Sequence, residues 1–228
     1  MLLWFTKNSK SVIIYAGDIM RLKHIKGADI EIKKSSYYIN DPESYKSKYN
    51  ELFKNNNPIH LEVGMGKGDF IIEMAKRNPD INFIGMEKFD SVLVKATRKL
   101  EGIDLPNLRL LWFDAEKINT IFEHEVDTLY LNFSDPWPKK KHAKRRLTSE
   151  VFLEKYDNIF KNGKNIIMKT DNRKLFEYSV KSLTDYGYKI EDISLDLHKD
   201  VVDIVETEYE RKFVALGNPI YQINVNKE

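Results

Sequence analysis

One short segment, residues 134–146, carries the residue types with the clearest chemical use, Ser-Asp-Pro-Trp-Pro-Lys-Lys-Lys-His-Ala-Lys-Arg-Arg. Each proline fixes its own φ and favours an extended predecessor, so we expect a rigid, non-helical loop that presents Asp135 and Trp137. The six lysines and arginines within residues 139–146 can neutralise phosphates. The segment is typical of a site that holds one base and grips the phosphates beside it. A solvated charge run beside a proline turn is the alternative.

A glycine-rich stretch, Glu62-Val63-Gly64-Met65-Gly66-Lys67-Gly68, follows an apolar run and precedes a helical pattern. Glycines there allow a sharp turn and a close approach of a ligand to the backbone. Their spacing is Gly-x-Gly-x-Gly, which differs from the Gly-x-Gly-x-x-Gly of dinucleotide-binding proteins. Glu62, two residues before the first glycine, opposes a pyrophosphate but suits a positively charged ligand.

Two further acids follow the next two predicted strands: Glu87 in Gly85-Met86-Glu87 and Asp114 in Trp112-Phe113-Asp114-Ala115. Carboxylates at the ends of successive parallel strands line one crevice at the carboxyl edge of a sheet. S-adenosylmethionine fits such a crevice, because it is a nucleoside with a sulfonium and an ammonium in place of phosphates. The alternatives are a surface strand residue for Glu62 and helix N-caps for Glu87 and Asp114.

Apolar runs of strand length alternate with amphipathic segments along most of the chain. We expect strands at 59–63, 81–86, 108–113, 126–133, 165–169 and 189–195, and helices at 70–75, 91–100, 152–160 and 175–183. This alternation predicts a doubly wound α/β fold, with a mostly parallel sheet and helices on both faces. We expect one domain over residues 20–228. Residues 1–19 lack a clear period, so we interpret them as a mis-assigned start, with translation from Met20, or as a loosely attached arm.

Composition narrows the class of protein. With 228 residues, 42% hydrophobic and 12% aromatic, the chain can bury a core. The absence of cysteine excludes disulfides, cysteine-ligated zinc and a thiolate nucleophile, and the five histidines lack metal-ligand spacing, so no metal is predicted. The formal net charge is only +2, so the basic run is a local concentration of charge. No apolar stretch approaches the roughly 20 residues of a membrane helix, and we expect a soluble, cytoplasmic protein.

Four stretches together resemble the bacterial tRNA (guanine-N7)-methyltransferases. They are the glycine-rich stretch, residues 131–142 (Leu-Asn-Phe-Ser-Asp-Pro-Trp-Pro-Lys-Lys-Lys-His), Lys169-Thr170-Asp171-Asn172 and Thr207-Glu208-Tyr209-Glu210. The resemblance runs in unbroken order from about Met20 to near the C-terminus; Asp-Pro-Trp-Pro-Lys-Lys is specific to the family, whereas many methyltransferases share the glycine loop. It implies a Rossmann-like methyltransferase domain. That domain would transfer a methyl group from S-adenosylmethionine to N7 of a guanosine in the variable loop of tRNA. Separately, we expect no obligate protein partner, and a monomer or a homodimer.

The resemblance also implies residue roles. The expected cofactor-binding residues are Glu62, Gly64, Gly66, Gly68, Glu87, Asp114 and Asp135, of which Asp135 is also the expected catalytic residue. The expected substrate-binding residues are Lys139, Asp171, Thr207, Glu208, Tyr209 and Glu210. The expected RNA-binding residues are Lys141, His142, Ala143, Lys144, Arg145 and Arg146. The departures from the family are small: Lys141 and Ala143 stand inside the basic run, and the leader before Met20 is unlike the family.

The chemistry of guanine N7 explains why carboxylates suit such a site. N7 has a lone pair and no proton, so it needs no general base; it needs orientation and stabilisation of the positive charge that develops on the purine. Asp135, Asp171 and Glu210 are candidates, because a carboxylate can accept from N1–H and the exocyclic amine. Asp171 can instead cap a helix near residue 173. Residues 207–210 alone fit an edge strand better, and Trp137 either stacks on a base or wedges the loop.

Other functions remain as alternatives. Exocyclic-amino methyltransferases usually have two adjacent prolines before the aromatic residue, whereas here Trp137 separates them. Methylation at C5 of a pyrimidine by a cysteine nucleophile is excluded by the lack of cysteine. The glycine spacing and Glu62 disfavour a nicotinamide dehydrogenase. A catalytically silent RNA-binding module of the same fold is the alternative from another class, and the intact glycine loop and Asp135 weigh against it.

Overall fold

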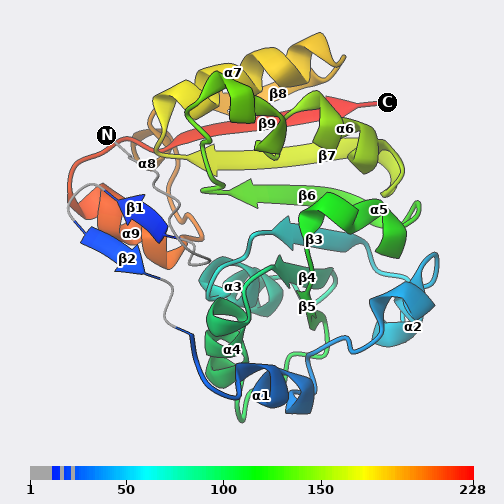
Figure 1. Ribbon diagram of the computed structural model, residues 1–228. Helices are drawn as coiled ribbons and strands as arrows, with labels where there is room; N and C mark the ends of the chain where they lie inside the picture. The colour runs from blue at the N-terminus through cyan, green and yellow to red at the C-terminus, as the bar shows by residue number, and fades with distance from the viewer. Residues whose placement is uncertain (1–11, 16–17, 22–23) are drawn as a thin grey trace.

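The computed structural model describes residues 12–15, 18–21 and 24–228, and its centre is a seven-stranded sheet (Figure 1). The sheet has the order β5-β4-β3-β6-β7-β9-β8. The strands are β3 (Ile59–Val63), β4 (Asn82–Glu87), β5 (Leu108–Trp112), β6 (Val126–Asn132), β7 (Phe160–Thr170), β8 (Lys189–Ser194) and β9 (Tyr221–Lys227). Neighbours from β5 to β7 are parallel, whereas β9 is antiparallel to both β7 and β8. The sheet is therefore mostly parallel, as the sequence predicts.

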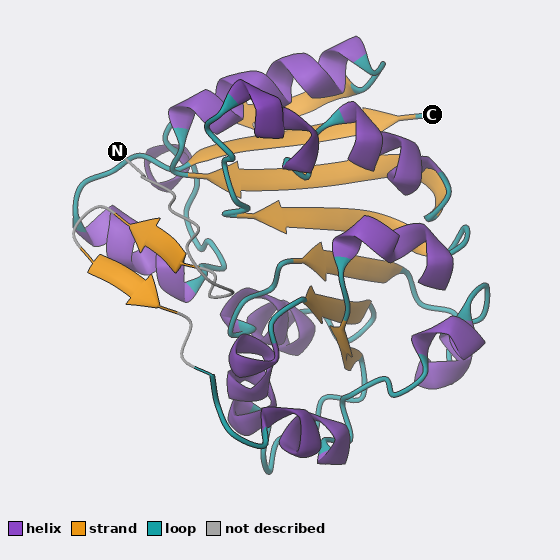
Figure 2. Ribbon diagram, viewed as in Figure 1, coloured by secondary structure: helices purple, strands orange, loops and turns teal. Residues whose placement is uncertain are grey.

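Helices lie on both faces of this sheet (Figure 2). They are α1 (Ala28–Lys34), α2 (Asn50–Phe53), α3 (Asp69–Arg77), α4 (Asp90–Lys99), α5 (Ile118–Ile121), α6 (Glu150–Asp157), α7 (Arg173–Asp185), α8 (Leu197–Asp200) and α9 (Glu208–Ala215). Three short 3₁₀ helices, η1 (Pro42–Tyr45), η2 (Ala115–Lys117) and η3 (Lys140–Arg145), complete the described helical segments.

Two apolar clusters show the layering. One holds buried side chains of α1, α3 and α4, and the other those of α2, α5, α6 and α7. Alternate residues of a strand enter opposite clusters: Phe83 of β4 packs with the first and Ile84 with the second. The doubly wound α/β architecture is thus confirmed. None of the helices in the described ranges is long and apolar enough to span a bilayer.

The boundary between α6 and β7 differs from the expectation. The helix expected at 152–160 ends at Asp157. Strand β7, which was expected to begin at residue 165, already begins at Phe160. Pairing explains the difference, since Phe160 pairs with Val126 of β6 and Lys164 already pairs with Lys227 of β9.

The expected domain boundary at Met20 falls inside a β-hairpin. Strands β1 (Val12–Tyr15) and β2 (Asp18–Arg21) pair antiparallel, with Met20 opposite Ile13. The two strands form a separate sheet from β3–β9. Residues 1–11 and 16–17 of the expected leader lie outside the described residues.

Asn107 fastens the end of α3 to the start of β4. Its buried side-chain amide donates to the carbonyl oxygens of Ala75 (3.0 Å), Asn78 (3.1 Å) and Ile81 (2.9 Å). The carbonyl of Asn78 also accepts from the backbone N–H of Ile81 at 3.2 Å. The Asn107 amide therefore adds to the backbone pairing of this turn between helix and strand.

Asn107→Ala should therefore lower the free energy of unfolding by about 3 kcal/mol, because buried carbonyls would lose their donor. Urea unfolding followed by circular dichroism measures the change. Asn50→Ala removes an amide of the same type from an exposed hydrogen bond to Asn56 and should cost no more than about 0.5 kcal/mol. Equal losses in the two variants would contradict this account.

Candidate functional site

The carboxyl ends of four neighbouring parallel strands meet at one edge of the sheet, and the predicted acids gather there. Glu62 lies near the end of β3 and Glu87 ends β4, while Asp114 and Asp135 follow β5 and β6. Glu87 lies close enough to both Glu62 and Asp135 for their charges to repel. The sheet therefore brings the four predicted carboxylates to one edge, as expected from parallel pairing.

Glu62 is fully enclosed by protein. One carboxyl oxygen, Oε1, accepts a hydrogen bond from Nδ2 of Asn132 at 2.8 Å. The other, Oε2, and Oδ1 of Asn132 are buried and have no hydrogen-bond partner among the described residues. Burial raises the pKa of Glu62 to about 7, although Asn132 and the ammonium of Lys169 oppose that shift. Glu62 is thus not a surface strand residue.

Glu87 shapes the glycine loop. Its buried carboxylate accepts from the backbone N–H of Gly66 at 3.1 Å and from that of Phe89 at 2.9 Å. Burial raises the pKa of Glu87, while these backbone donors lower it in part. Phe89 occupies the N-cap position of α4, so Glu87 braces the loop before the helix and is not its cap.

Asp114 has the role that the alternative interpretation assigned to it, and it remains accessible. Its Oδ1 accepts from the N–H of Glu116 at 3.0 Å and so caps η2, while Oδ2 pairs with Lys88 at 2.7 Å. Burial raises the pKa of Asp114, but the Lys88 ion pair and the backbone donor outweigh burial, and the pKa is lowered overall.

The glycine loop turns through positive φ at each glycine, with φ of 77° at Gly64, 60° at Gly66 and 78° at Gly68. A side chain at Gly64 or Gly66 would start in open space, since no heavy atom lies within 4 Å of an added Cβ. A side chain at Gly68 would press on Ala96 of α4 at 3.1 Å. The first two glycines therefore leave the backbone open to a ligand, and the third permits close helix packing.

The Asp135 loop is held in an uncommon conformation. Phe133 and Trp137 both have positive φ, at 51° and 39°, which is rare for bulky side chains. The N–H of Phe133 donates to the carbonyl oxygen of Lys169 at 2.8 Å, which ties the loop to β7. Asp135 itself is exposed at the surface, yet the surrounding protein desolvates its carboxyl group and raises its pKa.

The expectation of a wholly non-helical segment at 134–146 is wrong in its second half. Residues 134–139 form neither helix nor strand, but residues 140–145 form the 3₁₀ helix η3. Lys139, Lys140, Lys141, Lys144 and Arg145 are exposed, and His142 and Ala143 are half-buried. Arg146 differs from the rest of the run: its guanidinium turns inward and lies over the ring of Tyr178 at 4.1 Å.

The expected substrate residues divide between exposed and enclosed positions. Asp171 accepts from the hydroxyl of Tyr209 at 3.2 Å, and burial raises its pKa. Asn172, not Asp171, is the N-cap of α7 and accepts from the N–H of Leu175, so the capping alternative for Asp171 is wrong. Lys139 is exposed beside the Asp135 loop.

Residues 207–210 begin helix α9, so the edge-strand alternative is also wrong. Thr207 and Glu210 form a reciprocal capping box, in which each side chain bonds the backbone N–H of the other residue. Glu208 pairs with Lys67 of the glycine loop at 2.6 Å and with Lys212 at 2.9 Å, and these two ion pairs lower its pKa to about 2. Glu210 is completely buried.

Sequence reasoning missed a buried cation at the end of β7. The Lys169 ammonium donates to both carboxyl oxygens of Glu210, at 3.0 and 3.3 Å, and to the carbonyl of Val205 at 2.9 Å. His198 bonds the same carboxylate at 3.0 Å through Nε2. Asn132, the partner of Glu62, was missed as well, although Asn132 and Lys169 both stood inside the quoted motifs.

Within the described ranges, no cluster of three or more histidines and acids is arranged to hold a metal ion.

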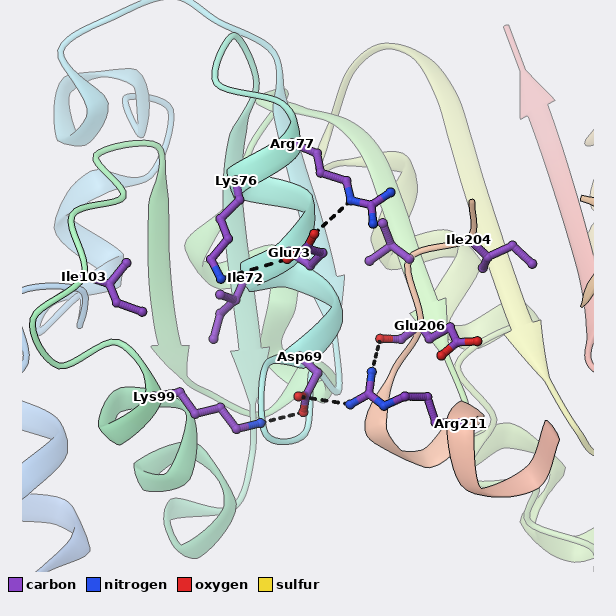
Figure 3. Close-up of a pocket in the computed structure, with 11 residues that line it drawn as sticks. Asp69, Ile72, Glu73, Lys76, Arg77, Lys99, Ile103, Ile204, Glu206 and Arg211 are labelled. Atoms are coloured by element: carbon purple, nitrogen blue, oxygen red, sulfur yellow. Dashed lines mark hydrogen bonds and ion pairs between the residues drawn. The ribbon is translucent and has the colours of Figure 1, made fainter. Parts of the chain in front are cut away.

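A charged groove of about 410 Å³ lies beside the glycine loop, between α3 and the segment that leads into α9 (Figure 3). Asp69 lies between Lys99 and Arg211 and forms ion pairs with both, at 2.6 Å and 3.4 Å. The Lys67–Glu208 and Asp69–Arg211 pairs together fasten α9 against the start of α3. The groove thus borders the acid-lined edge without containing its carboxylates.

Comparison with known proteins agrees with this arrangement. The family described as "Putative methyltransferase" matches residues 56–223. Among solved structures, the 16S rRNA methyltransferase KamB superposes with a TM-score of 0.62 at 17% identity, over 79% of this chain and 92% of KamB. A 30S ribosomal A1408 methyltransferase from an uncultured bacterium gives 0.61 at 16% identity, over 80% and 93%. At such low identity these likenesses show the fold alone.

Curated relatives are much more similar in sequence. The tRNA (guanine-N(7)-)-methyltransferase of Bacillus velezensis is 51% identical over 209 residues, which is 90% of this chain and 96% of the relative. The enzyme of the same name from Bacillus subtilis is also 51% identical, over 90% of this chain and 98% of the relative. At this identity and coverage, and with the acid-lined sheet edge in place, the chain belongs to the tRNA (guanine-N7)-methyltransferase family.

Proposed function

We propose that this chain transfers the methyl group of S-adenosylmethionine to N7 of a guanosine in tRNA, at the carboxyl edge of β3, β4 and β6. One observation carries the assignment of the cofactor-binding part of the site: Glu62 Oε2 and Asn132 Oδ1 are buried acceptors without a partner among the described residues. Buried acceptors require a donor, and a cationic donor suits a carboxylate better than a phosphate-bearing ligand does. The names of the curated relatives support the substrate and the position of methylation.

The residues present fit this cofactor. Glu62 and Asn132 would hold its ammonium, Gly64 and Gly66 would let it approach the backbone, and Glu87 and Asp114 would accept from its ribose and base. When bound, it supplies a methyl group on a sulfonium, which needs no further activation. The remaining work falls to the protein, which has to orient the acceptor and exclude water.

The acceptor side of the site supports attack by a nitrogen without a proton. Asp135 and Asp171 are carboxylates at the ends of neighbouring strands β6 and β7, and neither is neutralised by an ion pair with a lysine or arginine among the described residues. Both can accept from a guanine edge, and both can stabilise the positive charge that develops on the ring. Tyr209 fixes Asp171 through its hydroxyl.

The tRNA backbone would lie along η3. Four lysines at the start of η3 and within it, at 139, 140, 141 and 144, are exposed, and none of them forms an ion pair with an acid among the described residues. Cations that are not already paired can neutralise phosphates at little cost. We assign guidance of the phosphates to these lysines, and base orientation to the Asp135 loop that precedes them.

The raised pKa of Glu62 gives a prediction for cofactor binding. A cationic ligand favours the ionised carboxylate, whereas at pH below about 7 the free protein holds a proton on Glu62. Affinity for S-adenosylmethionine should therefore rise roughly tenfold or more from pH 5.5 to 7.5 and then level off. Glu62→Gln should bind weakly with little pH dependence. Titration calorimetry in two buffers of different ionisation enthalpy measures both affinity and proton release; an unchanged pH profile in Glu62→Gln would refute the assignment.

The lysines of η3 give a prediction for tRNA binding. Replacing Lys140, Lys141 and Lys144 together by alanine should reduce the slope of log Kd against log salt by about three, roughly one for each lost phosphate contact. Filter binding at several salt concentrations measures the slope. The matched control replaces Lys33, Lys34 and Lys95, which are exposed on α1 and α4, and should leave the slope close to that of the wild type. Equal slopes in both triple variants would support the alternative interpretation, in which η3 is a solvated charge run.

Asp135 gives the test of the reaction itself. Incubation of unmodified tRNA with the protein and methyl-labelled cofactor, followed by nucleoside analysis, should yield 7-methylguanosine. Asp135→Asn should lower kcat by about 100-fold while unfolding within about 0.5 kcal/mol of the wild type, because the side chain is exposed. The wild-type rate should not climb between neutral and alkaline pH, since N7 loses no proton. A steady climb, or label on an exocyclic amine, would favour the amino-methyltransferase alternative.

A further inference from the structure

Arg146 closes the basic run but does not share its environment. Its Nε donates to the carbonyl oxygen of Pro136 and its Nη2 to that of Trp137, both at 3.0 Å. The guanidinium also lies over the ring of Tyr178 on α7, 4.1 Å from the ring centroid. Two of the five N–H donors of the guanidinium therefore bind backbone carbonyls, and one face of the group is covered by an aromatic ring, so contacts within the protein fix its position.

The two carbonyls are placed on either side of one residue. The carbonyl of Pro136 belongs to the peptide unit before the Cα of Trp137, and the carbonyl of Trp137 belongs to the unit after it. The planar guanidinium of Arg146 binds both peptide units in one rigid arrangement, so it fixes φ and ψ of Trp137 together. This matters because Trp137 has φ of 39°, a region that a bulky residue keeps only where surrounding contacts impose it.

The conformation of Trp137 determines where its neighbours point. Asp135 lies two residues before Trp137 in a loop stiffened by two prolines, so a change at Trp137 propagates to the carboxylate. Cζ of Arg145 lies 4.8 Å from the centroid of the indole ring, and the His142 ring lies nearly perpendicular to the indole, with 5.8 Å between the centroids. Trp137 therefore also orients η3. Arg146 is thus placed to control both the carboxylate and the first turn of the basic helix.

We propose that Arg146 is a positioning residue that clamps the Asp135 loop in its reactive geometry, and is not a phosphate contact of the basic run. The inference rests on the proposed function for what the loop does, but the clamp itself can be tested without the reaction. A lysine at this position would keep the positive charge, yet a single ammonium cannot hold two peptide units in a fixed plane.

Arg146→Lys is therefore the decisive variant, with Arg146→Ala beside it. At saturating tRNA both should lower kcat by about 10- to 100-fold, as expected for misplacement of a catalytic group, with the salt slope of tRNA binding unchanged. Lys144→Ala is the matched variant for a phosphate contact and should reduce that slope by about one. Tyr178→Leu removes the stacking face but keeps both hydrogen bonds, so its loss of kcat should be smaller.

A spectroscopic measurement reports the loop directly. The chain has three tryptophans, so protein labelled with 5-fluorotryptophan should give three ¹⁹F resonances, and Trp137→Phe identifies one of them. In Arg146→Lys the Trp137 resonance should shift or broaden while the other two stay in place, which also shows that the variant is folded.

Two results would overturn the proposal. One is a Trp137 resonance and a kcat that Arg146→Lys leaves unchanged. The other is a salt slope that drops by about one in Arg146→Ala and is restored in Arg146→Lys, the behaviour of a phosphate contact. Wild-type protein that fails to methylate tRNA would defeat the proposed function instead, while the resonance shift would still decide whether Arg146 clamps the loop.

Discussion

The buried ammonium of Lys169 is the charge on which the acid-lined edge of the sheet depends. Its side chain pairs with Glu210 at the start of α9 and bonds the carbonyl of Val205, while its own carbonyl holds Phe133 at the start of the Asp135 loop. The same ammonium lies 5.2 Å from the centre of the Phe70 ring on α3 and opposes the rise that burial causes in the pKa of Glu62. Because an unpaired buried charge is costly, these segments are forced to converge on one point.

The acids of this edge differ in their exposure to solvent, and their pKa values shift in different directions. Burial raises the pKa of Glu62 and of Glu87, so both hold their charge only when donors or a cation supply compensation. Asp114 and Glu208 sit nearer to solvent with lysine partners, and their pKa values are lowered. The charge of the enclosed acids therefore depends on the donors around them, whereas the accessible acids stay ionised and fix the positions of a turn and a helix.

Most of the sheet could be predicted because its central strands are short apolar runs bounded by turn residues, and parallel pairing then places their terminal acids together. Residues 207–210 show the limit of pattern reading: polar and aromatic residues alternate as in an edge strand, although the Thr-x-x-Glu spacing of a capping box was the better signal. Strand β9 was not anticipated at all.

Contacts between distant segments account for what remained hidden. Lys169 is buried because Glu210, 41 residues later, encloses it, and no local pattern reports such a partner. Arg146 looks like one more cation of a charge run, and its inward direction depends on Tyr178 and on carbonyls of a loop with positive φ. The role of Asn132 follows from its hydrogen bond to the buried Glu62, a contact that the sequence alone does not show.

The position of β9 has a consequence for how the fold is reached. This strand follows β7 and β8 in the chain but lies between them in the sheet, pairing with both. Until residues 221–227 arrive, β7 and β8 cannot be linked, and the long β7 keeps an unpaired row of backbone groups open to other chains. Since Lys169 and Thr170 pair with residues of β9, the carboxyl end of β7 gains its last support only from this late strand. A ribosome-bound chain that stops short of β9 would thus expose an unpaired strand edge, open to association with other chains, next to the acid-lined edge of the sheet.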